Sequence, residues 1–444
     1  MSLHAGVSVR EITPRTPMFL VGYPHVPRIS TGVHDPLLAS ALCLRNDAGA
    51  VLLMAVDLLF ISTATAREVR GRIAAQTGLC DAQIFISCTH THSGPVTMDL
   101  LAWRDDPCVP PVDDAYLAWL VDALVAAAVE AAETPHDAAL AWASADARGV
   151  GSNRLSPDGV TDPEAGVLAV RTRGGAWLAL ASIYGMHPTV LHEDSTHISG
   201  DFPAFTRQHL REALGEHLVV LYHNAPCGNQ SPRYAVTAQT FAEAERLGRL
   251  LGERILTAVR RMGADDFSRD ILLAGRLGSM APIPRAMPSV AEAESLLRER
   301  VAEFARLCAD GAGHGPVRTA ECAVFGAEET LVLAQAQATG ELARIHEAYH
   351  QAEVQAVRIG ERVLVGWPCE LFTEYARALK QRASLPVHPV CLVNGELQGY
   401  IVTQEAAVAG GYEAANSLFT PETGEALVAK GVELVAALHD LILR

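Results

Sequence analysis

The sequence predicts an α/β fold of mixed α+β type, in which several layers of mixed β-sheet are covered by helices. Three observations predict it. Apolar, strand-like runs alternate with helical periodicity along the chain, candidate ligand residues follow directly after several of these runs, and 49% of the 444 residues are hydrophobic. A chain of this length can bury a large core. We expect residues 1–444 to form one large domain with its candidate ligands at strand ends.

Each element is predicted from a local pattern. Short apolar runs bounded by turn residues predict strands at Leu38–Leu44, Val51–Leu58, Gln83–Cys88, Ala138–Ala143, Gly166–Arg171, Trp177–Ile183, Leu218–Tyr222 and Ala356–Val365. Apolar residues that recur with a period near 3.6 predict helices at Thr65–Gln76, Ala115–Glu133, Pro203–Leu214, Ala238–Met262, Val290–Cys308, Leu371–Gln381 and Pro421–Leu443.

Two consecutive segments interrupt this alternation. Leu277–Pro288 is rich in Pro, Gly and Met and shows no periodicity, whereas Val290–Ala348 is largely helical and charged. We expect residues 290–348 to be a helical insertion over the core and not a separate domain. A segment with helices of its own is often a lid or a pocket wall, and a structural brace is the alternative.

The composition excludes several classes of partner. A net charge of −16 argues against nucleic acid or an anionic membrane surface, and no apolar stretch is as long as a membrane span. The N-terminus shows no charged region followed by an apolar one, and the nine scattered cysteines form no Cys-x-x-Cys pair. We therefore expect a reduced, cytoplasmic protein that acts on a small molecule. The composition leaves its oligomeric state open.

The run Gln83–Cys88 leads straight into His90 and His92, which one threonine separates. Alternate side chains of a strand point to the same face, so the two imidazoles can converge on one point. The Ser-Gly-Pro of residues 93–95 then breaks the strand, so both imidazoles lie at its carboxyl end, where α/β proteins usually carry their chemistry. Such a pair of imidazoles suits a transition metal, and zinc is the first candidate. The alternative is that the two histidines form a polar strand end that faces solvent.

The same pattern of a strand followed by a histidine or glutamate occurs twice more. His187 follows the predicted strand Trp177–Ile183, and Glu370 follows the apolar run that ends at Val365. Glu370 also suits the first turn of a helix, where the helix dipole favours negative charge. Three protein ligands and one open position are what catalytic zinc needs. The sequence therefore predicts a metal site at His90, His187 and Glu370.

The loop of residues 223–234 is dense in Gly, Pro and Asn, which is typical of a tight, shaped backbone. This loop can expose Ser231 or present N–H donors to an oxyanion. The alternative is that Ser231 is a plain turn residue. Asp201 precedes the helix that begins at Pro203. We expect it to cap that helix or to orient a histidine ligand from behind.

Taken together, these segments resemble the neutral (non-lysosomal) ceramidase family of zinc amidases. The resemblance runs from near the N-terminus to about Phe419, with the motifs in the same order. The matching motifs are the His-Thr-His-Ser-Gly-Pro of residues 90–95, Asn153-Arg154, His187-Pro-Thr with Ile198-Ser-Gly-Asp201, Gly228-Asn-Gln-Ser231-Pro, Pro368-Cys-Glu370-Leu-Phe-Thr373, and Tyr400-Ile-Val-Thr403 followed by Tyr412-Glu-Ala-Ala.

Carried over by matching position, the resemblance implies a set of site residues. The implied zinc ligands are His90, His187, Glu370 and Tyr400. The residues implied to lie around the reacting carbonyl are His92 and Tyr412, with Arg154 and Ser231 nearby. Chemistry alone does not indicate Tyr400, because tyrosine is a rare zinc ligand.

The sequence departs from the family's pattern at several positions. Asn229 stands where the family's Gly-Asp-x-Ser-Pro has aspartate, which removes a charge beside Ser231, and Cys369 replaces a glycine. Phe202-Pro203 replaces the residues that follow the aspartate of the second histidine segment. We expect no immunoglobulin-like domain after the final helix, and ceramide as the substrate does not follow from the resemblance.

The sequence therefore predicts a zinc-dependent amidohydrolase, acting on linear amides of an N-acyl substrate by metal-activated water, with a place in lipid metabolism. His92 is expected to act as general acid and base, and Tyr412 and Arg154 to stabilise the oxyanion or hold the substrate. Ser231 is expected to form hydrogen bonds, with a nucleophilic role left open. The alternatives are a zinc esterase or deacetylase acting on a soluble acyl substrate, and a non-catalytic metal-bearing protein that binds a ligand.

Overall fold

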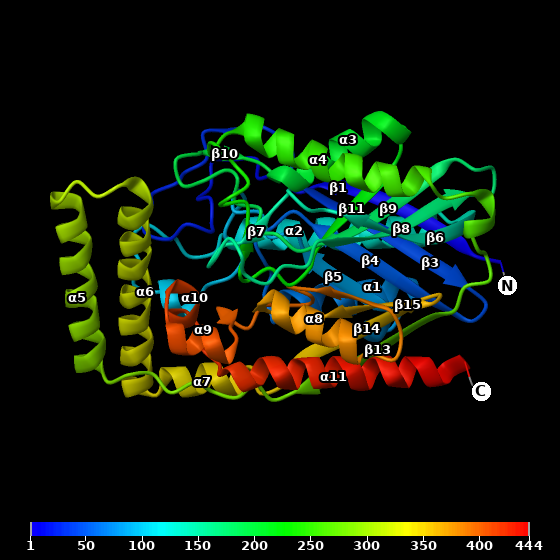
Figure 1. Cartoon of the computed structure of the whole chain (residues 1–444). Coiled ribbons are helices and arrows are strands. Elements are labelled where there is room, and N and C mark those ends of the chain that lie inside the picture. The colour runs from blue at the N-terminus through cyan, green and yellow to red at the C-terminus, as the bar shows by residue number, and fades with distance from the viewer. Residues whose placement is uncertain (1, 443–444) are drawn as a thin grey trace.

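The computed structural model describes residues 2–442 and has a mixed α/β fold, as the sequence predicts (Figure 1). The largest sheet has the strand order β11-β9-β8-β6-β1-β3-β4-β5. Its strands are β1 (His4–Glu11), β3 (Leu38–Asn46), β4 (Gly49–Val56), β5 (Ile84–Cys88), β6 (His136–Asp146), β8 (Glu164–Thr172), β9 (Trp177–Tyr184) and β11 (Val219–Asn224).

A second sheet has the order β13-β14-β15-β17. Its strands are β13 (Leu273–Met280), β14 (Ala352–Ile359), β15 (Arg362–Gly366) and β17 (Val387–Val390). Three short ladders pair β2 (Gly32–Val33) with β10 (His197–Ile198), β7 (Ser152–Asn153) with β12 (Gln230–Ser231), and β16 (Glu370–Leu371) with β18 (Tyr400–Ile401).

Helices cover the sheets or flank one end of them. They are α1 (Thr63–Thr77), α2 (Asp114–Glu133), α3 (Phe202–Leu214), α4 (Phe241–Arg260), α5 (Val290–Ala309), α6 (His314–Thr339), α7 (Glu341–Ala348), α8 (Thr373–Arg382), α9 (Gln404–Ala409), α10 (Tyr412–Ala415) and α11 (Pro421–His439). Leu443, the predicted end of the last helix, lies outside the described residues.

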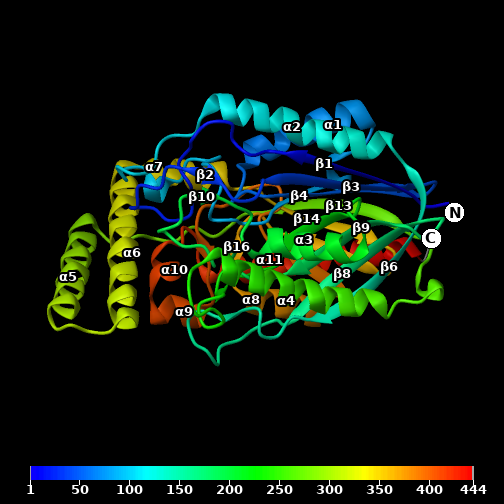
Figure 2. The ribbon, with the colours of Figure 1, turned by 90° about the horizontal axis from the view of Figure 1, so that it is seen from above.

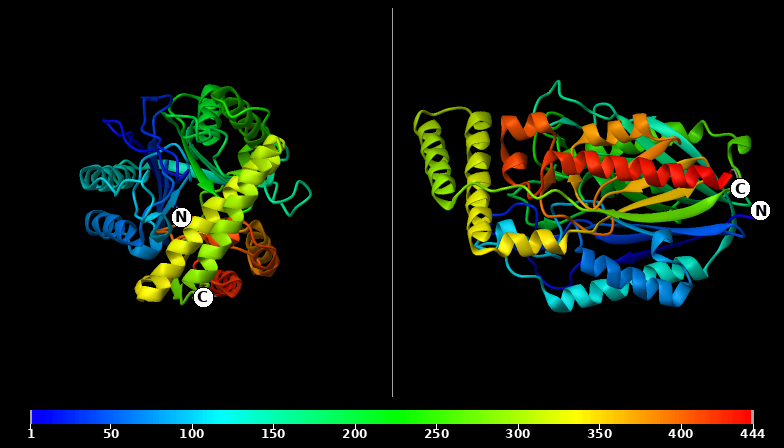
Figure 3. Two further views of the ribbon diagram at one scale, coloured as in Figure 1. Left: turned by 90° about the vertical axis from the view of Figure 1, so that its left-hand side faces the viewer. Right: turned by 90° about the horizontal axis from the view of Figure 1, so that it is seen from below.

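Three layers of β-sheet surround one shared core. The eight-stranded sheet divides into β1-β3-β4-β5 and β6-β8-β9-β11, which are joined by a short pairing of β1 with β6. Apolar side chains from both halves and from the four-stranded sheet form a single inner cluster. Helix pairs cover the outer sides: α1 and α2 on the first half, α3 and α4 on the second, and α8 and α11 on the four-stranded sheet (Figures 2 and 3).

Strand β4 shows how the sequence specifies two buried faces. Val51 and Leu53 belong to the inner cluster, whereas Leu52 and Met54 belong to the cluster beneath α1 and α2. Because alternate side chains of a strand point to opposite faces, a strand covered on both sides reads as a continuous apolar run.

The predicted strand Ala356–Val365 is in fact a hairpin. Strands β14 and β15 pair antiparallel, with Ile359 opposite Arg362. Gly360 adopts a left-handed φ of 68° in the turn, which glycine adopts without a steric penalty. Strands β1, β13 and β17 were not predicted, and glycines in β13 weaken its strand pattern. At Gly275 a Cβ would lie 1.8 Å from the carbonyl oxygen of Ala82, so close packing demands glycine there.

The segment predicted as an insertion forms α5, α6 and α7. Helices α5 and α6 pack on each other as a hairpin at one end of the molecule, opposite the described ends of the chain (Figure 1). Helix α6 also packs on α10 and on the short 3₁₀ turn Leu101–Trp103. It therefore joins the hairpin to the end of the sheets where β5 and β9 lead into the candidate ligands.

One helix among residues 2–442, α2, is long and apolar enough to cross a membrane by length and composition alone. Its buried side chains pack against β1 and β3. The core helix of a globular domain passes the same test, so this is weak evidence for a membrane span.

Candidate metal centre and its cavity

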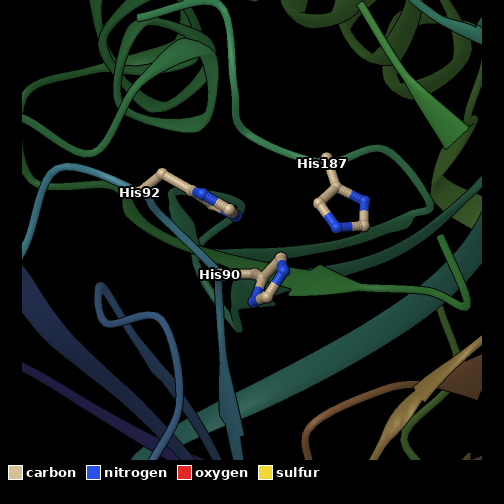
Figure 4. Close-up of side chains that lie close together, drawn as sticks. All are labelled: His90, His92 and His187. Atoms are coloured by element: carbon tan, nitrogen blue, oxygen red, sulfur yellow. The ribbon is translucent and has the colours of Figure 1, made fainter. Parts of the chain in front are cut away.

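Three buried histidines point their rings toward one another just beyond the strand ends (Figure 4). His90 and His92 follow β5, and His187 follows β9. The centroid of the His90 ring lies 4.9 Å from that of the His92 ring and 4.7 Å from that of the His187 ring. His90 has a left-handed φ of 71°. The rings therefore meet in a turn beyond the strand, and not through the alternation of an extended strand as predicted.

Backbone carbonyls fix the tautomer of each histidine. The Nδ1 atoms of His90, His92 and His187 lie 3.0, 3.0 and 2.7 Å from the carbonyl oxygens of Leu59, Gly22 and Cys227, respectively. A carbonyl oxygen only accepts hydrogen bonds, so each Nδ1 carries the proton. A ring with its only proton on Nδ1 directs the lone pair of its Nε2 atom toward the common centre.

Glu370 contributes a carboxylate oxygen to the same centre. Its Oε2 lies 3.2 Å from Nε2 of His90 and 3.1 Å from Nε2 of His187. Burial lowers the pKa of His187 to about 4, with Arg154 adding to the effect. Burial alone would raise the pKa of Glu370, but His90 and His187 outweigh it and hold that pKa well below its usual range.

These atoms form a donor set that fits a cation. A carboxylate oxygen here faces imidazole nitrogens, and such acceptor atoms repel one another unless a proton or a cation lies between them. The candidate ligand atoms of His90, His92 and His187 all lie within 4.8 Å of one another, so this group could hold a metal ion. Two imidazoles and a carboxylate are a common ligand set for catalytic zinc.

Tyr400 lies beside Glu370 because their strands pair. In the parallel ladder of β16 and β18, Glu370 is the partner of Tyr400. The Tyr400 ring stacks on His187 with centroids 6.3 Å apart. Burial and the charge of Glu370 raise the pKa of Tyr400 well above its usual value. The residue implied by resemblance therefore lies at the centre together with the predicted ligands.

Arg154 lies half-buried against the ring of Tyr400 and pairs with an acidic residue. Its guanidinium carbon lies 5.3 Å from the centroid of the Tyr400 ring, and its Nε lies 2.6 Å from Oε1 of Glu413. Burial would lower the pKa of Arg154, but Glu413 and Tyr400 outweigh it and raise that pKa. The ring of Tyr412 lies 6.1 Å from that of Tyr400. Arg154 thus places a positive charge against the ring of Tyr400, which in turn contacts Tyr412.

A cavity opens beside His90, His92 and Glu370. Its lining includes four large apolar residues, Leu59, Phe60, Leu100 and Trp103. The other lining residues are Gly22, His90, His92, Glu370, Glu396, Gly399, Tyr400, Tyr412 and Asn416. Reasoning from the sequence missed Trp103, Glu396 and Asn416. Glu396 lies four residues before Tyr400, and this proximity is the one signal that could have indicated it.

Ser231 lies next to Arg154 but does not belong to the cavity lining. In the ladder of β12 and β7, Ser231 is the partner of Ser152, and the backbone N–H of Arg154 donates to the carbonyl of Asn229. The hydroxyl of Ser231 accepts from the backbone N–H of Arg233 at 3.2 Å. This loop therefore braces the segment that carries Arg154.

The departures from the family pattern have local partners. Asn229 donates from Nδ2 to Oε2 of Glu374 at 2.8 Å and accepts from the backbone N–H of Thr373 at 3.0 Å. Asp201 caps α3 by accepting from the backbone N–H of Phe202. Burial raises the pKa of Asp201 to about 7. Of the two roles expected for Asp201, the structure shows the cap.

Comparisons with known proteins agree with this architecture. Neutral ceramidase from Pseudomonas aeruginosa superposes with a TM-score of 0.78 at 19% identity, over 99% of this chain and 75% of that chain. A ceramidase complexed with C2 superposes with a TM-score of 0.77 at 18% identity, over 99% and 76% of the two chains. A comparison with curated protein sequences gave no match. The family model described as neutral/alkaline non-lysosomal ceramidase, N-terminal, matches residues 3–238, more than half of the chain, and the protein therefore belongs to that family.

Proposed function

We propose that this protein is a zinc-dependent hydrolase that cleaves the linear amide bond of an N-acyl substrate with water. Membership of the ceramidase family supports amide hydrolysis. The observation that carries the proposal is the approach of Glu370 Oε2 to within 3.2 and 3.1 Å of the Nε2 atoms of His90 and His187. A buried cluster of acceptors in this arrangement suits a divalent cation.

His90, His187, Glu370 and Tyr400 are the residues that would hold zinc. Bound zinc supplies a Lewis acid that polarises a carbonyl group and lowers the pKa of water to about 7. Nitrogen and oxygen donors suit this metal. The carbonyl groups of Leu59 and Cys227 orient the two histidines from behind, as partners of metal-binding histidines commonly do.

His92 is the residue that would move the proton. Its Nδ1–H is held by the carbonyl of Gly22, and its Nε2 is buried without a hydrogen-bond partner among the described residues. Burial and the neighbouring His90 and His187 lower its pKa well below the usual value, so the ring is a neutral base at pH 7. Nε2 would take a proton from the attacking water and then give it to the leaving amine, so that one water yields one acid and one amine.

Tyr412 would donate a hydrogen bond from its hydroxyl group to the oxyanion, since it lines the cavity beside Tyr400. Arg154 lies below Tyr400 and outside the cavity lining, so it would act through that ring as a positioning residue. Ser231 would keep the loop in place through its hydrogen bond with Arg233.

The test combines metal content with a panel of acyl substrates. Elemental analysis should find about one zinc per chain in the wild type and none in the double variant His90→Ala, His187→Ala. The zinc-loaded protein should hydrolyse N-acyl compounds in preference to the matching O-acyl esters. Ceramide belongs in the panel because a related structure is that of a ceramidase complexed with C2. A wild type that takes up no zinc contradicts the metal assignment, and ester turnover alone contradicts the amidase assignment.

A further inference from the structure

Glu396 is a buried carboxyl in the cavity wall. Glu396 is 1% exposed, and no side chain among residues 2–442 donates a hydrogen bond to either of its carboxyl oxygens. It lies in the segment of residues 391–399 that joins β17 to β18, and it lines the cavity together with His92 and Glu370. The mechanism proposed above makes no use of this carboxyl.

The other polar side chains of this segment are hydrogen-bonded. Asn394 donates to the side chain of Gln355 at 2.6 Å. Gln398 accepts from the backbone N–H of Leu101 at 2.8 Å and donates to the hydroxyl of Tyr349. These bonds tie the segment to its surroundings on both sides of Glu396, which itself lines the cavity.

The backbone of the segment is fixed in an unusual conformation. Leu392, Asn394 and Gln398 have φ values of 55°, 57° and 64°. Side-chain-bearing residues rarely adopt this left-handed region, and they do so where the surrounding structure imposes it, commonly at functional sites. Such a backbone holds Glu396 in position at the cavity before a ligand arrives.

A buried carboxyl that no side chain donates to lowers the stability of the folded protein. The neighbouring charge of Glu370 adds to the penalty, because like charges repel in a buried environment. A leucine or glutamine at this position would fill the same space at a lower penalty. A donor group brought by a ligand removes the penalty and explains why the wall carries a carboxyl.

We propose that Glu396 recognises the substrate by accepting a hydrogen bond from an ammonium or hydroxyl group at the far end of its amine portion. This inference rests on the proposed amidase function and defines its substrate class as N-acyl diamines or N-acyl amino alcohols. The apolar lining residues Phe60 and Trp103 would contact the intervening methylene groups.

Three substrates of nearly equal size separate these chemistries. N-acetylputrescine ends in an ammonium, N-acetylaminobutanol in a hydroxyl and N-acetylpentylamine in a methyl group. In the wild type, kcat/KM for at least one of the donor-bearing compounds should exceed that for N-acetylpentylamine about tenfold to a hundredfold. The compound preferred identifies the donor.

Variants then test whether Glu396 is responsible. Glu396→Leu should bring the ratio of kcat/KM values close to one. Glu396→Gln should retain a preference for the hydroxyl and lose a preference for the ammonium, because an amide oxygen accepts but carries no charge. Glu329→Gln is the matched control, since Glu329 is equally buried but bonds to Trp103 and Asn416, and it should keep the wild-type ratio. A wild-type ratio in Glu396→Leu overturns the proposal.

A binding measurement separates this inference from the proposed function. Calorimetry should show that zinc-loaded wild type binds putrescine or aminobutanol and that Glu396→Leu, with its zinc content verified, binds it at least about tenfold more weakly. If this loss occurs while none of the N-acetyl compounds is hydrolysed, the inference stands and the amidase function fails. If N-acetylpentylamine is hydrolysed and Glu396→Leu changes neither ratio nor binding, the amidase stands and the inference fails.

Discussion

At the residue scale, the three histidines differ in what their Nε2 atoms face. His90 and His187 approach Glu370, whereas Nε2 of His92 has no partner among the described residues. We expect His92→Ala to retain zinc and to lower kcat about 10²–10⁴-fold, the usual contribution of a general acid–base group. His90→Ala should lose the zinc. Elemental analysis and steady-state kinetics check both variants, and a His92→Ala protein without zinc would instead make His92 a ligand.

Asn229 is a residue whose departure from the family pattern has a local reason. Its amide donates to Glu374, whose pKa is raised by burial. We expect Asn229→Asp to lower the free energy of unfolding by about 1–2 kcal/mol at pH 8, because two carboxylates would then face each other. Urea titrations measure the effect. It should shrink at pH 5, where one carboxyl can hold a proton, and Glu374→Gln added to Asn229→Asp should restore the stability.

The sequence alone indicated the ligands that stand directly after strands. His90, His187 and Glu370 each follow a continuous apolar run, which a local window detects. Tyr400 came from resemblance, because it reaches the centre by pairing with Glu370 across a two-residue ladder. Glu396 was missed because its position depends on left-handed backbone in residues 391–399, and such conformations follow from tertiary contacts and not from local pattern.

At the element scale, α6 is tied to two residues of the cavity lining through one buried carboxyl. Glu329 accepts from the indole N–H of Trp103 at 3.0 Å and from Asn416, and both of these residues line the cavity. Burial raises the pKa of Glu329 from 4.5 to about 8, although these hydrogen bonds favour the charged form. Helix α6 is therefore joined to the 3₁₀ turn and to α10 by a group that titrates near neutral pH.

We expect Glu329→Gln to gain stability relative to the wild type as pH rises. The folded protein binds the Glu329 proton more tightly than the unfolded chain, so this group's contribution to stability is present below pH 4.5 and is lost as pH rises through about 8. The difference in unfolding free energy between Glu329→Gln and wild type should grow by up to about 1.4 kcal/mol per pH unit between these values.

Denaturant titrations between pH 5 and pH 9 measure this difference. Glu328→Gln is the control, since Glu328 is the next residue on α6 and its side chain is 41% exposed. It should show no comparable change with pH. A Glu329→Gln difference that stays constant across the range contradicts the assignment of a raised pKa to Glu329.

The elements themselves were predicted unevenly. Strands with two buried faces, such as β4, appear in the sequence as continuous apolar runs. Such a run gives no sign of a tight turn inside it, so the β14–β15 hairpin was read as one strand. The pairing of β13 with β14 was missed because glycines weaken the apolar pattern of β13, whereas its close packing against Ala82 requires one of them.

At the scale of the whole molecule, the candidate metal centre lies where the three sheet layers meet. Its ligands follow β5 of the first layer, β9 of the second and β15 of the third. The segment after β17 joins these layers, since Cys391 donates from its backbone to Asn224 and Asn394 donates to Ile86. A local window predicts each strand, but which strand ends converge depends on the packing of three sheets, and this the sequence pattern does not contain.

This arrangement leads to a prediction about metal removal. A ligand that binds the folded protein and not the unfolded chain stabilises it, by about 2.7 kcal/mol at a free concentration of about 100 Kd. Zinc at this centre would join all three layers and would relieve the repulsion between Glu370 and the lone pairs of His90 and His187. We therefore expect a chelator to lower the thermal unfolding midpoint and added zinc to restore it.

Glu370→Gln provides the sharper comparison, because its amide can donate to an imidazole nitrogen. Without metal, this variant should unfold at a higher temperature than the metal-free wild type, while with zinc it should gain less. Calorimetric scans at matched rates, with and without chelator, measure all four midpoints. If the chelator leaves the wild-type midpoint unchanged while elemental analysis confirms that zinc has gone, the three layers are stable without a cation. In that case the acceptor cluster is held together by a proton on His90 or His187, and not by a metal.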